Sequence, residues 1–166
     1  MVIASPMSAF TATYDAVGNR LTVQEIDGTR VTYGYDAAYQ LTNEQRSGAN
    51  AFNTTYAYDG LGNRLTMNAS GQVTTYAYNA ANALTLQTPA SGAPTTSSYD
   101  ANGNLTLENA GGALTTYAWD GENRLLSVSA ASGIATYSYL AKGLRVKPSS
   151  GQSQIAQLIR NGVTGV

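Results

Sequence analysis

Five aspartates recur at similar intervals along the chain, and paired carboxylates are the groups that glycosidases use for acid–base catalysis. They are Asp15, Asp36, Asp59, Asp100 and Asp120. In equivalent positions of successive hairpins, two of them would lie about 9.6 Å apart, which is two strand spacings. This distance is too long for a retaining glycosidase pair and marginal for an inverting one. Each aspartate also opens a turn sequence, so we expect the five to initiate turns.

Composition excludes several other classes of chemistry. The 166 residues include no His and no Cys, so there can be no Ser-His or Cys-His nucleophile pair, no zinc site of the usual type and no disulfide. Only 11% of the residues are charged and the net charge is −1, which gives no electrostatic basis for binding nucleic acid. We therefore expect no catalytic, cofactor-binding or metal-binding residues.

A repeat of 20 to 23 residues organises the chain. Its anchor is an aromatic residue followed in most units by Asp: Tyr14-Asp15, Tyr35-Asp36, Tyr58-Asp59, Tyr78-Asn79, Tyr99-Asp100, Trp119-Asp120 and Tyr139-Leu140. A second aromatic stands two residues earlier in five units, at Tyr33, Tyr56, Tyr76, Tyr117 and Tyr137. A Leu or Val follows each anchor by six or seven residues, and a Gly follows by twelve to fourteen.

Each unit predicts two short strands and two turns. In Thr-Tyr-x-Tyr segments the two rings fall on one face of a strand, because side chains alternate. No unit has the spacing of an amphipathic helix. In the first turn of three units, Asp stands first and Gly18, Gly62 or Gly103 stands fourth, where a positive φ is needed. The last unit keeps the Gly, at Gly143.

Variants of these turns lead to further predictions. Asn82 and Asn123 replace the fourth-position Gly in two units, and Asn is the next residue most tolerant of positive φ. Tyr39 occupies the same position and does not share this tolerance, so we expect the loop 36–40 to be built differently. The second turn is a Gly-containing pair such as Asp27-Gly28, Ser70-Gly71, Gly111-Gly112 or Ser132-Gly133, which favours a hairpin.

These features predict an all-β fold, a meander of about fourteen antiparallel strands in a curved spiral sheet. Residues 1–166 form a single array of seven units: a lead-in strand 1–13, repeats 14–147 and a terminal strand 148–166. The structural repeat residues are Tyr14, Asp15, Gly18, Tyr33, Tyr35, Asp36, Tyr56, Tyr58, Asp59, Gly62, Tyr76, Tyr78, Tyr99, Asp100, Gly103, Tyr117, Trp119, Asp120, Tyr137 and Tyr139.

The segments YDAVGNRL, YDGLGNRL and YDANGNL, each followed by a Gly turn and a TTYAY-like strand, resemble the YD repeats of the Rhs family. Related repeats occur in bacterial polymorphic toxins, insecticidal toxin-complex subunits and teneurins. The resemblance implies a spiral β-sheet that, in long members, forms a hollow shell around a toxic C-terminal domain. Family self-cleavage involves Asp-Pro signatures, and no Asp-Pro dipeptide occurs here, so that activity is not carried over.

Size limits this interpretation. About fourteen strands make a strip roughly 67 Å wide, which closes into a ring roughly 21 Å across. A folded 100-residue cargo is about 30 Å or more in diameter. We therefore expect a fragment of a larger shell, a short relic or a unit that associates.

The partners expected are adjoining YD repeats, another copy of the chain through unpaired edge strands, and a cargo polypeptide. No nucleic acid and no membrane span are expected, because no long apolar run occurs. The resemblance implies a secreted or cell-surface bacterial protein, although residues 1–10 show no cleavable signal peptide.

Three alternatives remain open. The tyrosines could form a ladder that stacks sugars in a carbohydrate or cell-wall module, although Trp119 is the only tryptophan. Asn, Asp and Gly turns could hold calcium, but the period is longer than in calcium-binding repeats. The arginines Arg20, Arg64 and Arg124 recur at one place and could bind a partner; solvated edges or pairs with a neighbouring Asp are the simpler interpretation.

Overall fold

The structure is a computed structural model that describes residues 10–140 and 143–146. These residues form β-strands joined by turns and contain no helix, so the predicted all-β fold is confirmed. Contacts divide the chain into two compact units, Met1–Tyr76 with Pro89–Ser91 and Ala77–Thr88 with Gly92–Val166. The predicted terminal strand 148–166 and residues 1–9 of the predicted lead-in strand lie outside the described residues.

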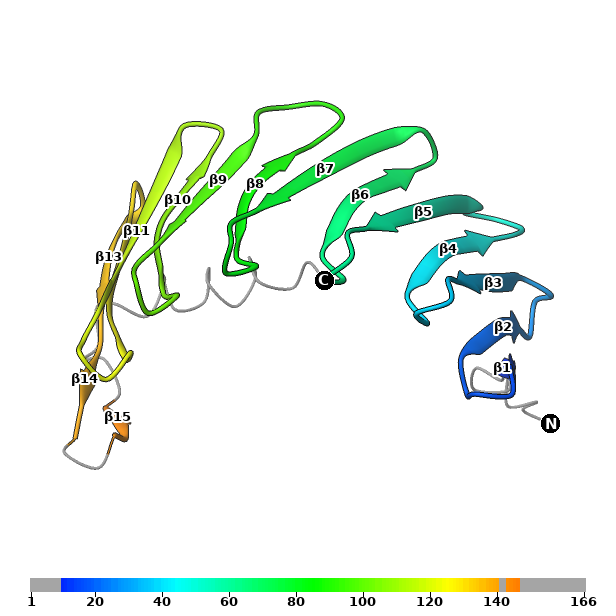
Figure 1. The fold of residues 1–166 in the computed structure, drawn as a ribbon, viewed down its shortest axis with the longest axis horizontal. Coiled ribbons are helices and arrows are strands. Elements are labelled where there is room, and N and C mark those ends of the chain that lie inside the picture. Colours follow the sequence, from blue (N-terminus) through cyan, green and yellow to red (C-terminus); the bar gives the residue numbers. More distant parts are fainter. Residues whose placement is uncertain (1–9, 141–142, 147–166) are drawn as a thin grey trace, which may run out of the picture. The chain divides into compact units, whose positions relative to one another are not determined.

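The first unit is an antiparallel meander in which each strand pairs with its neighbours in sequence (Figure 1). Short turns after each strand return the chain at once, which is why sequential strands become partners. The strands are β1 (Phe10–Tyr14), β2 (Arg20–Glu25), β3 (Arg30–Tyr35), β4 (Leu41–Arg46), β5 (Phe52–Tyr58), β6 (Arg64–Ala69) and β7 (Gln72–Tyr78), whose last two residues belong to the second unit.

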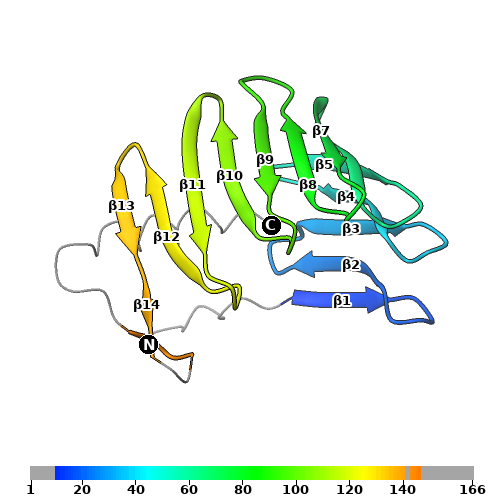
Figure 2. The same ribbon diagram turned by 60° about the vertical axis from the view of Figure 1, so that its left-hand side comes forward.

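The second unit repeats this arrangement, and its strands lie side by side in Figure 2. A separate two-stranded antiparallel pair, β14 with β15, follows the meander. The strands are β8 (Leu84–Thr88), β9 (Thr95–Tyr99), β10 (Leu105–Ala110), β11 (Ala113–Trp119), β12 (Leu125–Ala130), β13 (Gly133–Thr136), β14 (Ser138–Tyr139) and β15 (Arg145–Val146).

A β-bulge follows the first turn in five of the units. In the first, Thr13 pairs with Thr22 and Tyr14 pairs with Arg20, which leaves Leu21 as the extra residue. The same shift occurs in the strand pairs β3–β4, β5–β6, β9–β10 and β11–β12. The repeated leucine therefore occupies two different places: Leu21 lies at a bulge and is 38% exposed, whereas Leu125 pairs with Trp119.

The two faces of each strand differ in burial, as the Tyr-x-Tyr spacing predicts. In β5, Thr54 is buried and Tyr56 and Tyr58 are half-buried, while the residues between them are exposed. In β11, Thr115, Tyr117 and Trp119 alternate in the same way with exposed neighbours. Each pair of rings therefore lies on one face of its strand.

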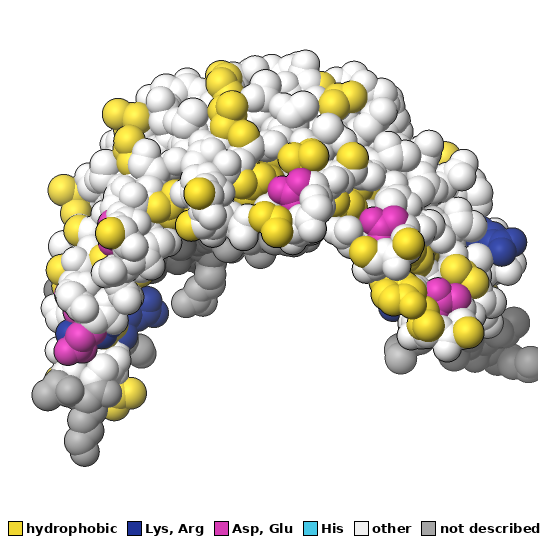
Figure 3. Space-filling model, in the orientation of Figure 1, with side chains coloured by type: hydrophobic (Ala, Val, Ile, Leu, Met, Phe, Trp, Pro, Cys, Tyr) yellow, Lys and Arg dark blue, Asp and Glu magenta, His cyan; other side chains and the backbone are white. Residues whose placement is uncertain are grey.

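Burial is shallow among the described residues, and few side chains are less than 9% exposed. The most buried side chain among those described is Val128, at 2% exposure, which packs with Ala135 and Tyr137. Hydrophobic side chains are scattered over the surface seen in Figure 3. Contacts between neighbouring strands must therefore supply most of the stability.

Candidate functional site

The first turn of each unit, here called the YD turn, is a five-residue loop organised by its opening carboxylate. In the loop 59–63, Asp59 Oδ1 accepts hydrogen bonds from the amides of Leu61 and Asn63, both at 2.9 Å. Its Oδ2 accepts one from Asn63 Nδ2 at 2.9 Å. The backbone closes the loop through Gly62 N to Asp59 O and Asp59 N to Asn63 O. Both oxygens of the Asp59 carboxylate thus accept hydrogen bonds from groups within its own turn.

The same bonds recur in the other YD turns. The acceptors Asp15, Asp36, Asp100 and Asp120 each bind the amides two and four residues on and a side chain four residues on. Asn79 keeps the two amide bonds with its single oxygen. The turn therefore does not require a charge, and at Leu140, which has no side-chain acceptor, the two closing backbone bonds still form, from Leu140 N to Leu144 O and from Gly143 N to Leu140 O.

These hydrogen bonds also lower the pKa of three of the aspartates, Asp59, Asp100 and Asp120. Donation by the side chain and then the backbone of Asn63 lowers the pKa of Asp59, and Asn104 lowers the pKa of Asp100 in the same way. The backbone N–H of Arg124 is the largest influence on Asp120, whose pKa is also lowered. A general base near neutral pH needs a raised pKa, so the shifts run opposite to those that catalysis requires.

A second set of bonds joins successive units. In each, the anchor aromatic donates to the backbone carbonyl five residues after the Asp or Asn of the preceding unit; we call this the inter-repeat hydrogen bond. The donor–acceptor distances are 2.7–2.9 Å, which is short and well formed. The five pairs are Tyr35 with Arg20, Tyr58 with Leu41, Tyr99 with Leu84, Trp119 Nε1 with Leu105, and Tyr139 with Leu125.

Arginine side chains cover many of the tyrosine rings. The Arg64 guanidinium carbon lies 4.5 Å from the centre of the Tyr76 ring and 5.9 Å from that of Tyr56. Similar contacts join Arg20 to Tyr33, Arg124 to Tyr139 and Arg145 to Tyr137. Such cation–π contacts contribute about 0.5–1 kcal/mol each at exposed sites.

The arginine prediction is thus correct for one residue and incomplete for two. Arg124 pairs with Asp120 at 2.6 Å, and this hydrogen bond raises the pKa of Arg124. Arg20 and Arg64 instead lie over rings. The sequence could not show this, because the rings belong to a different strand.

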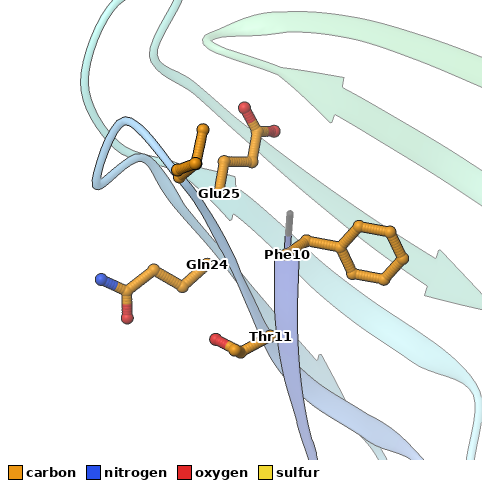
Figure 4. Close-up of a pocket in the computed structure, with 5 residues that line it drawn as sticks. Phe10, Thr11, Gln24 and Glu25 are labelled. Atoms are coloured by element: carbon orange, nitrogen blue, oxygen red, sulfur yellow. The ribbon is translucent and has the colours of Figure 1, made fainter. Parts of the chain in front are cut away.

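A shallow pocket lies where β1 begins and β2 ends. Its volume is about 300 Å³, and Phe10, Thr11, Gln24, Glu25 and Ile26 line it. In Figure 4 the Phe10 ring and the Glu25 carboxylate lie on one side of the strands, and Thr11 and Gln24 point to the other. Glu25 is engaged with Arg46, whose two Nη atoms lie 3.0 and 3.1 Å from its carboxylate oxygens. No set of polar groups converges in this pocket.

Neither a metal cluster nor a membrane-spanning helix emerges from the rest of the described chain. Residues 10–140 and 143–146 contain no group of three or more acidic, His or Cys side chains placed to hold a metal ion. Over the same residues, no helix has the length and apolarity needed to cross a bilayer.

The RHS Repeat family matches four stretches, residues 14–51, 58–94, 78–113 and 99–136, of which the last three overlap in sequence. The chain belongs to the Rhs repeat family. No curated protein matches it in sequence. The six YD turns that begin with Asp or Asn all lie within the matched stretches.

Solved toxin-complex structures share the fold. The chain is similar to TcdB2-TccC3-Cdc42, with 17% identity, a TM-score of 0.67 and coverage of 89% of this chain and 10% of the other. TcdB2-TccC3 without its hypervariable C-terminal region gives the same identity and score over 90% and 10%. The Photorhabdus luminescens Tc holotoxin pore gives 14% identity and a TM-score of 0.52 over 82% and 10%. The chain thus spans about a tenth of these proteins.

The Rhs repeat around Tyr39 corrects a prediction made from the sequence. The loop 36–40 was expected to differ from the others, and this is wrong. Tyr39 adopts φ 62°, its amide donates to Asp36 O, and Asp36 N donates to Gln40 O. Asp36 Oδ1 accepts the same two amides as in the other YD turns. The carboxylate and the closing backbone bonds hold Tyr39 in a conformation that it disfavours alone.

Replacing Tyr39 by glycine should therefore stabilise the protein. Tyr39 is 59% exposed, so its side chain contributes little packing, and glycine adopts positive φ without strain. We expect the free energy of unfolding to rise by roughly 0.5–1 kcal/mol in urea titrations. The matched Gly62→Ala variant, at φ 87°, should lose a similar amount. A less stable Tyr39→Gly protein would contradict this account of the turn.

Three of the four predicted second turns lie where the sequence places them. Asp27-Gly28 closes its hairpin through Gly28 N to Glu25 O and Glu25 N to Thr29 O. Ser70-Gly71 and Gly111-Gly112 both have positive φ at each position, as two-residue type I′ hairpins require. The prediction for Ser132-Gly133 is displaced by one residue. Ala130 pairs with Gly133, so the loop is formed by residues 131–132 and Gly133 begins β13. Glycine alone does not define the register there.

Proposed function

We propose that the chain is a non-catalytic structural segment of an Rhs-type shell that encloses or presents a cargo polypeptide. The inter-repeat hydrogen bond carries this proposal. It recurs five times with the same donor and acceptor positions, so each repeat is built to be followed by another. The aspartates are the residues most suited to catalysis, and their carboxylates accept hydrogen bonds from their own turns, as Asp59 does.

The toxin-complex likeness supports the shell role. The matched proteins are about ten times longer than the aligned segment, so a shell requires many more repeats than this chain holds. Long Rhs proteins are expected to keep a C-terminal domain inside, and the cargo here would be such a polypeptide. A protein of this kind acts outside the producing cell, so secretion or surface exposure accompanies the proposal.

The surroundings of the tyrosines support packing between repeats better than they support carbohydrate binding. Sugar stacking needs an open ring face, whereas Arg64 lies against the rings of Tyr56 and Tyr76, and Tyr76 is 9% exposed. The hydroxyls of Tyr35, Tyr58 and Tyr99 are donated to backbone carbonyls. Packing of repeats accounts for both observations.

A chimera tests the scaffold role. Residues 10–146 would replace the matching tenth of the TcdB2-TccC3 chain, and limited proteolysis would measure protection of the C-terminal region. We expect protection close to that of the parent, because any run of well-formed Rhs repeats continues the wall. As a control, the same chimera with Tyr58→Ala, Tyr99→Ala and Trp119→Ala should be digested at least tenfold faster. A folded chimera that leaves the region as accessible as the control does would overturn the proposal.

A further inference from the structure

The carboxylates of Glu44 and Glu108 differ from those of the other acidic residues. All 10 acidic residues of the chain lie within the part that the structure describes. Within that part, Glu44 and Glu108 have no hydrogen bond and no ion pair. The other acidic side chains accept hydrogen bonds or pair with arginine; they are Asp15, Glu25, Asp27, Asp36, Asp59, Asp100, Asp120 and Glu122.

The two glutamates occupy the same place in their repeats. Each stands nine residues after the anchor aromatic of its unit, and each is half-buried. Glu44 lies directly opposite Thr54, and Glu108 lies directly opposite Thr115 in the equivalent pair of strands. Three other units have an apolar residue at this place, namely Val23, Met67 and Val128. A half-buried carboxylate costs stability where an apolar side chain would not, and such departures from a local rule are expected at functional sites.

A tyrosine hydroxyl lies near each of the two carboxylates, on the same face of the sheet. Tyr56 is the diagonal neighbour of Glu44, and Tyr117 is the diagonal neighbour of Glu108. Diagonal neighbours lie about 7–8 Å apart, within reach of long side chains. Burial raises the pKa of Tyr56 and of Tyr117, and the charge of the neighbouring glutamate raises each pKa further. Among the described residues, neither hydroxyl makes a hydrogen bond, so each place has two oxygen acceptors close together and unused.

Two arginines of the first unit show how a guanidinium group fits such surroundings. Arg46 donates through both Nη atoms to the Glu25 carboxylate, at 3.0 and 3.1 Å. The guanidinium carbon of Arg20 lies 6.0 Å from the centre of the Tyr33 ring, and hydrogen bonding to that tyrosine raises the pKa of Arg20. A guanidinium group carries five N–H donors in a flat fork, so a single group can bind a carboxylate and a phenol oxygen together.

We propose that Glu44 and Glu108 bind arginine side chains of the cargo polypeptide, each guanidinium bridging the carboxylate and the hydroxyl of Tyr56 or Tyr117. Charge complementarity favours this occupant, because a cation pairs with a half-buried carboxylate that no described group pairs with. Each site is complete within one compact unit, the first within Met1–Tyr76 and the second within Gly92–Val166. This inference rests on the scaffold role and deepens it by naming the chemistry of the cargo segment that the sheet binds.

Two peptides test the sites in NMR titrations of the full chain. One is a short peptide of alternating arginine and serine, and the other has citrulline, the neutral isostere of arginine, in place of each arginine. The arginine peptide should shift the amide signals of Thr54 and Thr115 and bind about three- to tenfold more tightly than the citrulline peptide, because only the arginine peptide is charged. Equal binding of the two peptides, or unchanged signals at both threonines, would refute the proposal.

Single substitutions assign the binding to each carboxylate. Glu44→Gln should weaken the binding observed at Thr54 about three- to tenfold and leave that at Thr115 unchanged, and Glu108→Gln should do the reverse. Glu122→Gln is the matched control, because Glu122 lies in a YD turn and its side chain is 72% exposed. This control should bind the peptide as the wild type does. An equal loss of affinity in the control would mean that overall charge attracts the peptide, which contradicts the proposed sites.

The tyrosine hydroxyl has a test of its own. Tyr56→Phe keeps the ring and the net charge, and it should weaken the binding observed at Thr54 about two- to fivefold. Tyr58→Phe is the matched control, because the Tyr58 hydroxyl already donates to the Leu41 carbonyl at 2.8 Å. The control should lower stability and leave peptide binding unchanged. Equal weakening of binding by the two variants would exclude the bridging role of Tyr56.

The chimera distinguishes failure of this inference from failure of the scaffold role. Glu44→Gln and Glu108→Gln leave the YD turns and the inter-repeat hydrogen bonds in place. A chimera with both substitutions should therefore still protect the C-terminal region while its affinity for the arginine peptide falls. Protection without arginine binding in the unsubstituted chimera would refute the sites alone, whereas loss of protection in that chimera would refute the scaffold role.

Discussion

Replacing Trp119 by alanine should lower the free energy of unfolding by about 3 kcal/mol. The half-buried indole lies opposite Leu125 in the neighbouring strand, and its Nε1–H donates to the Leu105 carbonyl at 2.7 Å. Alanine removes the packing of the ring together with this bond. Urea unfolding followed by far-ultraviolet circular dichroism measures the change, because the only tryptophan fluorophore is lost.

Two matched variants separate the two contributions. Trp119→Phe keeps an aromatic ring without a donor, so it should lose about 1 kcal/mol more than Trp119→Tyr. Trp119→Tyr restores the donor found at the other anchors, and its cost should be below about 1.5 kcal/mol. If tyrosine proved as harmful as alanine, the inter-repeat hydrogen bond would not be the reason for an aromatic donor at this position.

The fold could be predicted from the sequence because its signals are local. Alternation around Tyr56 and Tyr58 and the Asp-to-Gly spacing of the loop 59–62 depend only on neighbours in the chain. Each unit repeats the same signals, so an error in one unit is outweighed by the others. Tyr39 shows this: its residue type predicts a different loop, but the Asp36 bonds impose the common one.

The remaining features depend on groups that a sequence pattern does not display. The acceptor of Trp119 is a backbone carbonyl, which any residue at position 105 would supply. The bulge gives Leu21 and Leu125 different environments although both follow an anchor by a similar interval. Stacking of Arg64 on Tyr76 joins residues of different strands, and only the register brings them together.

The largest loss of stability is expected from Val128→Asp. Val128 in β12 is 2% exposed, lies opposite Tyr117 and Ala135, and packs with Tyr137. An aspartate there would place a carboxylate among apolar neighbours. Burying an unpaired charge costs several kcal/mol, so we expect a loss of roughly 3–5 kcal/mol at neutral pH, measured by urea unfolding.

The pH dependence and a neighbouring variant make this expectation specific. An unpaired buried carboxylate has a raised pKa, so the penalty should shrink as pH falls below that pKa and the group becomes neutral. Ile134→Asp, in the adjacent strand β13, is the matched control. Ile134 is 58% exposed and neighbours Ala135, so its side chain points to the opposite face of the sheet. The same charge there should cost less than about 0.5 kcal/mol. Equal losses at the two positions would mean that the face carrying Val128 and the tyrosines is not the buried one, and the packing on which the repeats depend would have to be assigned to the other face.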